Sequence, residues 1–132
     1  SINENSGKIG VLLAYECDEN NEKVSNLSKN LCMQIAASTP KSVDRESLDS
    51  KLVENEELIF REQLNNSGKP DEIINKIVEG KINKFYEEVC LNEQIFVMDG
   101  KIRISKLISN FNNENTLNFK IINLYIYKLG QE

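Results

Sequence analysis

The sequence predicts an α+β fold: a small antiparallel sheet covered by helices, with an inserted antiparallel helical hairpin. Three observations lead to this fold class. A short apolar, β-rich run lies near the N-terminus, and an alternating apolar run lies near the C-terminus. Between them, apolar residues recur at steps of three and four over longer segments, as they do on one face of a helix. A Gly-Lys-Pro turn joins two of these helical segments directly.

The chain begins with a predicted strand and helix. Residues 8–16 form the short apolar run, which is closed by a polar cluster, so we expect a buried strand there. Residues 21–38 place their apolar side chains on one helical face, and Asn20 or Asn21 can cap the start of this helix. We expect the helix to end before Pro40, because the residue before a proline disfavours the α region.

Residues 45–91 contain the predicted hairpin. The first helix covers residues 45–64 and the second covers residues 71–91, and long amphipathic helices joined by a short turn pack antiparallel. Gly80 lies inside the second helix. It is either a weak point tolerated there, a place of close helix packing, or the point where the hairpin bends or meets a neighbour's backbone. The candidate N-caps of the first helix are Asp44, Ser47 and Ser50.

The C-terminal part returns to the sheet. In order, we expect an extended segment at 94–98, a turn at Asp99-Gly100, a helix at 104–111, a loop at 112–115 and a strand at 117–129. The predicted organisation is therefore a core subdomain of residues 1–44 and 92–132, interrupted by the hairpin of residues 45–91.

Length, charge and hydropathy exclude some classes of function. A chain of 132 residues fits about one domain, and its net charge of -5 argues against nucleic-acid binding. Residues 45–94 hold twelve acidic and seven basic residues, which indicates either a solvated helix surface or an acidic docking face. No apolar run is long enough to span a membrane. Because the sequence starts with Ser1, we expect a fragment or a processed product.

The sequence gives little support for a catalytic site or a metal site. The sequence has no histidine, and its cysteines (Cys17, Cys32 and Cys90) are widely spaced, so we expect buried thiols in a reducing compartment and no zinc site. There is also no glycine-rich phosphate loop. A hydrolase acting through scattered carboxylates is the remaining enzymatic alternative. We therefore predict no catalytic residues, no metal and no cofactor.

Three segments, in the family's order, resemble translation elongation factor Ts. They are Lys8-Ile9-Gly10-Val11-Leu12-Leu13, then Leu31-Cys32-Met33-Gln34-Ile35-Ala36-Ala37-Ser38 followed by Pro40, and the stretch from Gly68-Lys69-Pro70 to Phe96-Val97. The closing strand diverges, because Ile126-Tyr127 and Gly130-Gln131-Glu132 stand where the family has Arg-Phe and Gly-Glu-Gly. These 132 residues contain neither the family's ubiquitin-associated-like module nor its Thr-Asp-Phe-Val motif.

The resemblance implies a guanine nucleotide exchange factor for elongation factor Tu that promotes GDP release, in the bacterial cytoplasm or an organelle matrix. It implies that this part docks on the third domain of Tu and that the hairpin contributes to a homodimer. The alternative is a structural self-association module without exchange activity. Each candidate docking residue can also be read as core or turn. These candidates are Met33, Ala36, Ala37, Pro40, Gln94 and Phe96.

Overall fold

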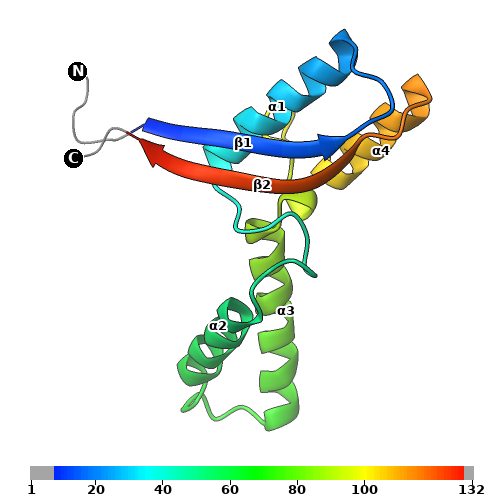
Figure 1. Cartoon of the computed structure of the whole chain (residues 1–132). Coiled ribbons are helices and arrows are strands. Elements are labelled where there is room, and N and C mark those ends of the chain that lie inside the picture. Colours follow the sequence, from blue (N-terminus) through cyan, green and yellow to red (C-terminus); the bar gives the residue numbers. More distant parts are fainter. Residues whose placement is uncertain (1–7, 130–132) are drawn as a thin grey trace.

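The computed structural model describes residues 8–129 and confirms the α+β class (Figure 1). The ends of the predicted core subdomain, residues 1–7 and 130–132, lie outside the described residues, and so does Gly130-Gln131-Glu132. The elements in chain order are β1 (Lys8–Glu16), α1 (Glu22–Ser38), α2 (Ser50–Gln63), α3 (Asp71–Val89), the 3₁₀ helix η1 (Leu91–Glu93), α4 (Ile104–Asn115) and β2 (Lys120–Leu129).

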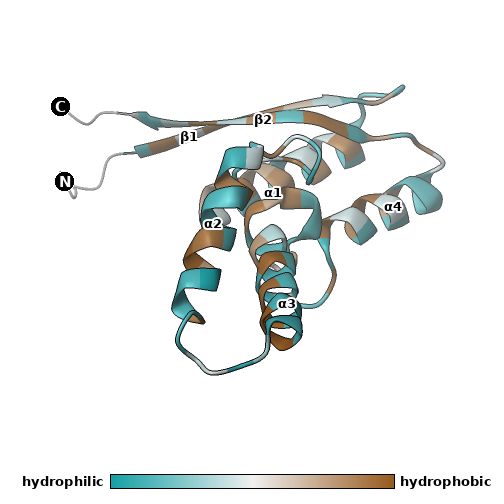
Figure 2. Ribbon diagram, turned by 90° about the horizontal axis from the view of Figure 1, so that it is seen from below, coloured by the Kyte–Doolittle hydropathy of each residue, from teal (hydrophilic) through white to brown (hydrophobic). Residues whose placement is uncertain are grey.

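The sheet consists of β1 and β2, which pair antiparallel from Lys8↔Leu129 to Glu16↔Lys120. A bulge between Ala14 and Tyr15 shifts the register by one residue of β2. Figure 2 shows the two strands as one layer with the helices on one side of it. The sheet therefore buries one face against the helices and leaves the other uncovered by the rest of the described chain.

The main core lies between this sheet and α1. The helix presents Val24, Leu31 and Ile35 to it, each with no exposed surface. From the sheet side, the ring of Tyr15 stacks on that of Phe119 with centroids 4.7 Å apart. The other buried members are Leu27, Val43, Leu91, Phe96, Ile104 and Ile121. Helix α1 is therefore the central element of the domain, because its apolar stripe contacts residues from both ends of the sequence.

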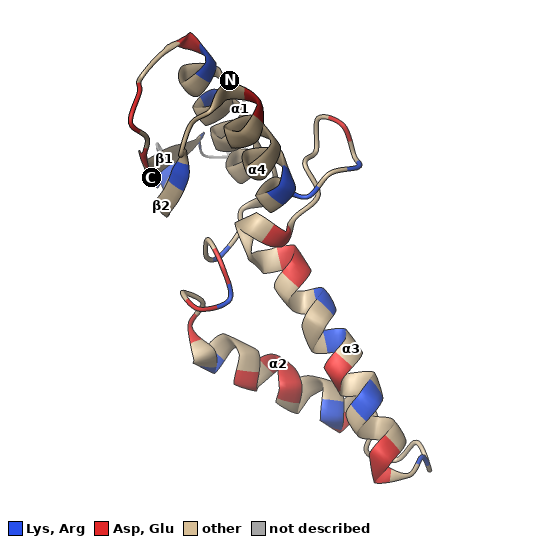
Figure 3. Cartoon of the chain, turned by 90° about the vertical axis from the view of Figure 1, so that its right-hand side faces the viewer, with Lys and Arg blue, Asp and Glu red and all other residues tan. Residues whose placement is uncertain are grey.

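Helices α2 and α3 contact each other and extend away from the sheet (Figure 1). Figures 1 and 3 show them crossing obliquely instead of lying parallel along their length. No residue of α2 is buried, and Val78 is the one buried residue of α3. A separate hairpin domain of residues 45–91 thus stays a prediction.

The predicted start of the first hairpin helix at residue 45 is wrong. Helix α2 begins at Ser50, because the backbone before it is used elsewhere: Ser42 forms a bridge with Cys90, and the carbonyl of Val43 accepts from the Asn92 N–H at 3.0 Å. The cap is Asp49, whose side chain accepts from the Lys51 N–H at 3.0 Å, and none of the three predicted caps serves.

Two C-terminal predictions also need correction. Helix α4 continues to Asn115 through the predicted loop, and the Asn115 side-chain amide donates to the carbonyl of Phe111 at 2.8 Å. Strand β2 begins only at Lys120, because Asn112 bonds both the N–H and the carbonyl of Phe119 and holds it outside the ladder. The extended segment at 94–98 pairs only through the single bridge Ile95↔Arg103.

Candidate partner-docking site

The C-terminal end of α1 carries three of the predicted docking residues on its outer side. Met33 is 55% exposed, and Ala36 and Ala37 are also exposed. The helix ends at Thr39, which adopts a left-handed conformation (φ 42°) and donates its N–H to the Ile35 carbonyl at 2.8 Å. Residues 30–40 contain no charged side chain. This helix end therefore presents an uncharged, largely apolar surface.

A second apolar segment lies beside it. Over residues 94–97 buried and exposed side chains alternate: Gln94 and Phe96 are buried, whereas Ile95 and Val97 are 39% and 54% exposed. Met98, which follows, is 56% exposed. The Phe96 N–H donates to the Ile102 carbonyl at 2.7 Å, which closes the loop over the Asp99-Gly100 turn. The loop thus directs its apolar side chains outward from a fixed backbone.

Gln34 joins the two segments. Its side chain is 1% exposed, and its Nε2 donates to Gln94 Oε1 and to the Ile95 carbonyl, both at 3.1 Å. Its Oε1 accepts from the Val97 N–H at 2.8 Å. Since a buried amide without partners is costly, this satisfied network defines one position of the loop on α1.

Gln94 extends the network to α3. Its Nε2 donates to the Glu88 carbonyl at 2.8 Å, and its Oε1 also accepts from Ser38 Oγ at 2.8 Å. Among the described residues, every buried side-chain nitrogen or oxygen has a hydrogen-bond partner. These hydrogen bonds therefore join the ends of α1 and α3 and the loop of residues 94–98 into one unit. We call its exposed apolar surface the docking patch: Met33, Ala36, Ala37, Ile95, Val97 and Met98.

The predicted candidates fall into two groups. Met33, Ala36 and Ala37 are exposed, whereas Pro40, Gln94 and Phe96 are buried. The buried three can support a docking surface but do not offer their side chains to a partner. The sequence reasoning overlooked Gln34, Ile95, Val97 and Met98. The sequence did contain a signal for the last three of them: residues 95–98 are all apolar, whereas an extended segment that is covered on one side buries only every second side chain.

A charged cluster fixes the segment before α2. Arg45 contacts Glu93 through two hydrogen bonds of 2.6 and 2.8 Å, and its guanidinium lies 4.2 Å from the centroid of the Tyr86 ring. The hydrogen bond from Arg45 lowers the pKa of Glu93 below its ordinary range. Burial raises the pKa of the Cys90 thiol, which lies nearby and accepts from Ser42 Oγ. Figure 3 shows that acidic residues are more frequent along α2 and α3 than on α1.

Within residues 8–129 no three His, Cys, Asp or Glu side chains are grouped to hold a metal ion. The helices described there are all too short or too polar to cross a membrane. The grooves between elements are open, and the one between α1 and α4 is lined by asparagines around Leu27, Leu107 and Phe111.

The comparisons with known proteins all match the same family. A family model described as Elongation factor TS matches residues 3–131. The chain is 44% identical over 109 residues to "Elongation factor Ts" of Nitratidesulfovibrio vulgaris, covering 80% of this chain and 54% of the relative. It is 40% identical over 125 residues to that of Clostridium botulinum, covering 95% and 41%. It is 38% identical over 131 residues to that of Rhodospirillum centenum, covering 99% and 43%. The chain thus spans about half, or less, of the length of these curated relatives.

Proposed function

Because this chain belongs to the elongation factor Ts family of translation elongation factors, we propose that it is the part of a guanine nucleotide exchange factor that docks on elongation factor Tu. The exchange activity belongs to the longer protein in this proposal, since the chain spans only 41% to 54% of the three relatives described above. The docking role belongs to the residues in hand.

The observation that carries the proposal is the docking patch. Exposed methionines and small side chains on a surface without charge are typical of protein contact sites, because they lose little hydration on burial. Met33, Val97 and Met98 are each more than half exposed. The Gln34 network holds them in place before a partner arrives, so little ordering entropy is lost on binding.

An exchange factor works by binding the nucleotide-free state of its partner more tightly than the loaded state. Such a protein needs a surface that grips the partner and a group that disturbs the nucleotide site. These 132 residues lack the Thr-Asp-Phe-Val motif to which the resemblance assigns the second task. In this proposal the chain therefore supplies the surface that grips the partner.

Two measurements test the proposal. Isothermal titration of Tu·GDP with the 132-residue chain is expected to show binding. Stopped-flow release of a fluorescent GDP from the same complex is expected to proceed at the rate of Tu alone. Binding without acceleration supports a docking part. Full acceleration by this chain would contradict the division of tasks, and no binding would contradict the docking role.

The hairpin supports a second candidate, self-association without exchange activity. Leu58, Ile59 and Ile73 are 66%, 43% and 43% exposed on α2 and α3, two helices that contact each other, and exposed apolar surface can mark a protein interaction site. If these residues pair two copies, Leu58→Glu abolishes the dimer in sedimentation velocity and leaves Tu binding intact. We place the protein in the bacterial cytoplasm or an organelle matrix, because its matched relatives come from bacteria.

A further inference from the structure

The docking patch lies in a basic part of an acidic chain. The two segments that carry it, residues 23–43 and 94–113, together hold six basic residues and one acidic residue, a net charge of +5. The whole chain has a net charge of -5, so the residues outside these two segments carry -10. Charge is therefore separated within the molecule, and the docking patch lies on its positive side.

Three exposed lysines border the docking patch. Lys29 lies four residues before Met33, and residues four apart lie on the same face of a helix. Lys41 is exposed three residues after the end of α1. Lys101 is exposed on the loop that carries the other half of the patch. None of the three forms an ion pair with another described residue, so their charges are available to a partner.

Few acidic side chains near the patch oppose these lysines. Within the loop, the Asp99 carboxylate accepts from the backbone N–H groups of Lys101 and Ile102 at 2.8 and 3.2 Å. Near the end of α3, Glu87 pairs with Arg103 at 3.8 Å. Both carboxylates are therefore directed to partners within the chain.

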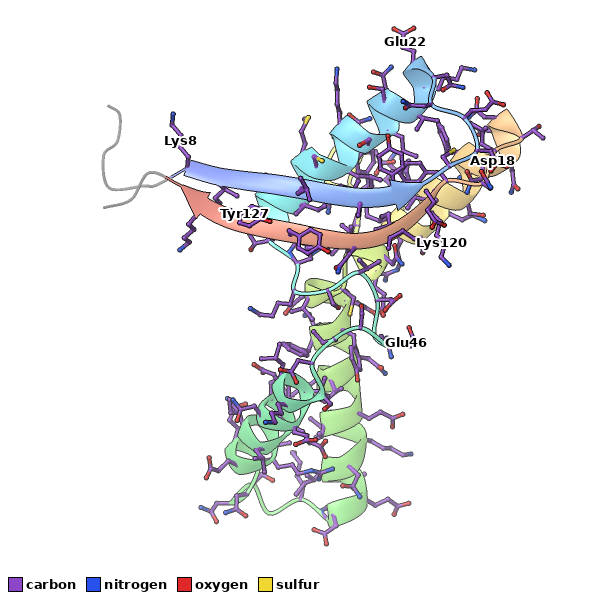
Figure 4. All side chains as sticks on the ribbon, viewed as in Figure 1. Lys8, Asp18, Glu22, Glu46, Lys120 and Tyr127 are labelled. Atoms are coloured by element: carbon purple, nitrogen blue, oxygen red, sulfur yellow. The ribbon has the colours of Figure 1, made fainter. Side chains whose placement is uncertain are left out.

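The other acidic residues lie mostly farther from the patch. Glu88 is exposed in the last turn of α3. Figure 4 shows Asp18 and Glu22 at the end of the molecule where α1 begins, whereas the patch includes the end of that helix. Most acidic residues of α2 and α3 lie along helices that extend away from the sheet (Figures 1 and 3). The border of the patch is thus mainly positive.

We propose that the docking patch recognises an apolar surface of Tu that is bordered by carboxylates, and that Lys29, Lys41 and Lys101 steer the two proteins into contact. This inference rests on the proposed function and adds to it the charge of the partner's surface and the way in which the complex forms. A lysine is a flexible, strongly hydrated point charge, so at the border of an interface it attracts a partner while remaining in water. Charges in that position act mainly on the rate of association.

The range of these charges decides which of them matter. At physiological ionic strength, exposed charges act over about 8 Å. A partner that approaches the patch therefore senses the three lysines before it senses the hairpin, although residues 45–94 hold twelve acidic and seven basic residues. The same acidic hairpin repels a surface of carboxylates. Encounters in which the patch faces the partner are favoured for both reasons.

Stopped-flow association of the 132-residue chain with Tu·GDP, from about 0.01 to 1 M NaCl, measures the steering, because the screening length falls from about 30 Å to about 3 Å over this range. The association rate constant is expected to fall as salt is added, and the dissociation rate constant is expected to change little. Steering by a whole surface raises association rates about 10- to 1,000-fold, so one lysine of three accounts for about two- to tenfold.

Lys29→Gln, Lys41→Gln and Lys101→Gln should each lower the association rate constant by that factor at about 0.01 M NaCl and match the parent at about 1 M. Lys29→Arg keeps the charge and should associate like the parent. Lys76→Gln is the matched control, since it makes the same change of charge at an exposed position on α3 and should leave the rate unchanged. Thermal melts of each variant check that the fold is intact.

Slower association of the three border variants, with unchanged dissociation and with Lys76→Gln like the parent, supports the inference. Binding of the parent at a rate that salt does not change overturns it. So does an equal effect of Lys76→Gln, or an effect of the border variants on dissociation alone. These three outcomes leave the docking role itself standing. An absence of binding at every salt concentration contradicts the docking role, and this inference falls with it.

Discussion

Gln34 and Gln94 lie 60 positions apart in the sequence and share a buried hydrogen bond of 3.1 Å. Through this pair, the end of α1 is joined to the segment that leaves α3. The same two amides also bond the backbone at Glu88, Ile95 and Val97. Two side chains thus set the relative position of the two halves of the docking patch.

Gln34→Leu tests this relationship. The change keeps the approximate volume but leaves the Val97 N–H and the Ile95 carbonyl without their partner. We expect the free energy of unfolding to fall by about 1–3 kcal/mol. Hydrogen exchange at the Val97 amide should accelerate more than exchange in β1. Met33→Leu, one residue away and exposed, is the control and should change neither. Equal effects of the two variants would show that the network does not hold the loop.

Gly80→Ala is expected to stabilise the protein by about 1 kcal/mol. A Cβ added at Gly80 meets nothing within 4 Å, so the change raises helix propensity without a clash. This geometry also removes the interpretation that a neighbour's backbone approaches Gly80 within this chain. Gly68→Ala is the matched comparison and should destabilise, because Gly68 has a φ of +78°. Thermal melts measure both. A loss of stability on Gly80→Ala would point to a contact outside this chain.

The Arg45–Glu93 pair predicts a pH dependence. Arg45→Gln should lower the free energy of unfolding at neutral pH by about 1 kcal/mol or less, because Arg45 is 41% exposed and solvent screens the pair. The folded-state pKa of Glu93 lies below its ordinary value of 4.5. The pair's contribution is therefore complete above that value and is lost as the pH falls through the folded pKa.

Urea denaturation of parent and variant at several pH values checks this. The two curves of stability against pH should converge on the acid side of 4.5. Arg61→Gln removes the exposed Glu57–Arg61 pair on α2 and serves as the control, with a smaller effect at neutral pH. A difference between parent and Arg45→Gln that stays constant into acid would mean that Arg45 acts through its contact with the Tyr86 ring and not through its pair with Glu93.

Removal of residues 50–80, most of the predicted hairpin of residues 45–91, tests whether the core folds without it. Replacing residues 50–80 by a flexible Gly/Ser linker should leave a folded core, because the main core contains no residue of that segment. The linker must start after Leu48, since Val43 and Leu48 are buried and Ser42 pairs with Cys90. Amide NMR signals of α1 and the sheet should persist. A collapsed spectrum would show that α2 and α3 are needed for folding.

The elements were predictable from the sequence because each has a strong local signal. The apolar steps of α1 and the Gly-Pro turn before α3 define those elements without any tertiary information. The start of α2 was not predictable, since the backbone of residues 41–43 forms hydrogen bonds with that of residues 89–92. The start of α2 depends on the bridge between Ser42 and Cys90, which lie some fifty residues apart in the sequence.

The sheet faces show a similar limit. Alternation through Phe119, Ile121, Tyr125 and Tyr127 suggests one common face. The bulge adds one residue to β2, so Phe119 and Ile121 are buried while the two tyrosines are exposed on the outer face. Some of the docking candidates are buried and others are exposed. In a segment as short as residues 94–98, periodicity alone cannot predict which side chains are buried.

The central claim is that the docking patch grips elongation factor Tu, and the affinity of patch variants for Tu·GDP tests it most directly. Met33→Glu and Met98→Glu place a charge in the patch on surface positions, so their melting temperatures should match the parent's. Each is expected to weaken binding at least tenfold by isothermal titration, the usual scale for a central contact residue. Leu58→Glu on α2 should bind like the parent. Unchanged affinity of both patch variants, or loss of binding only in Leu58→Glu, would contradict the claim.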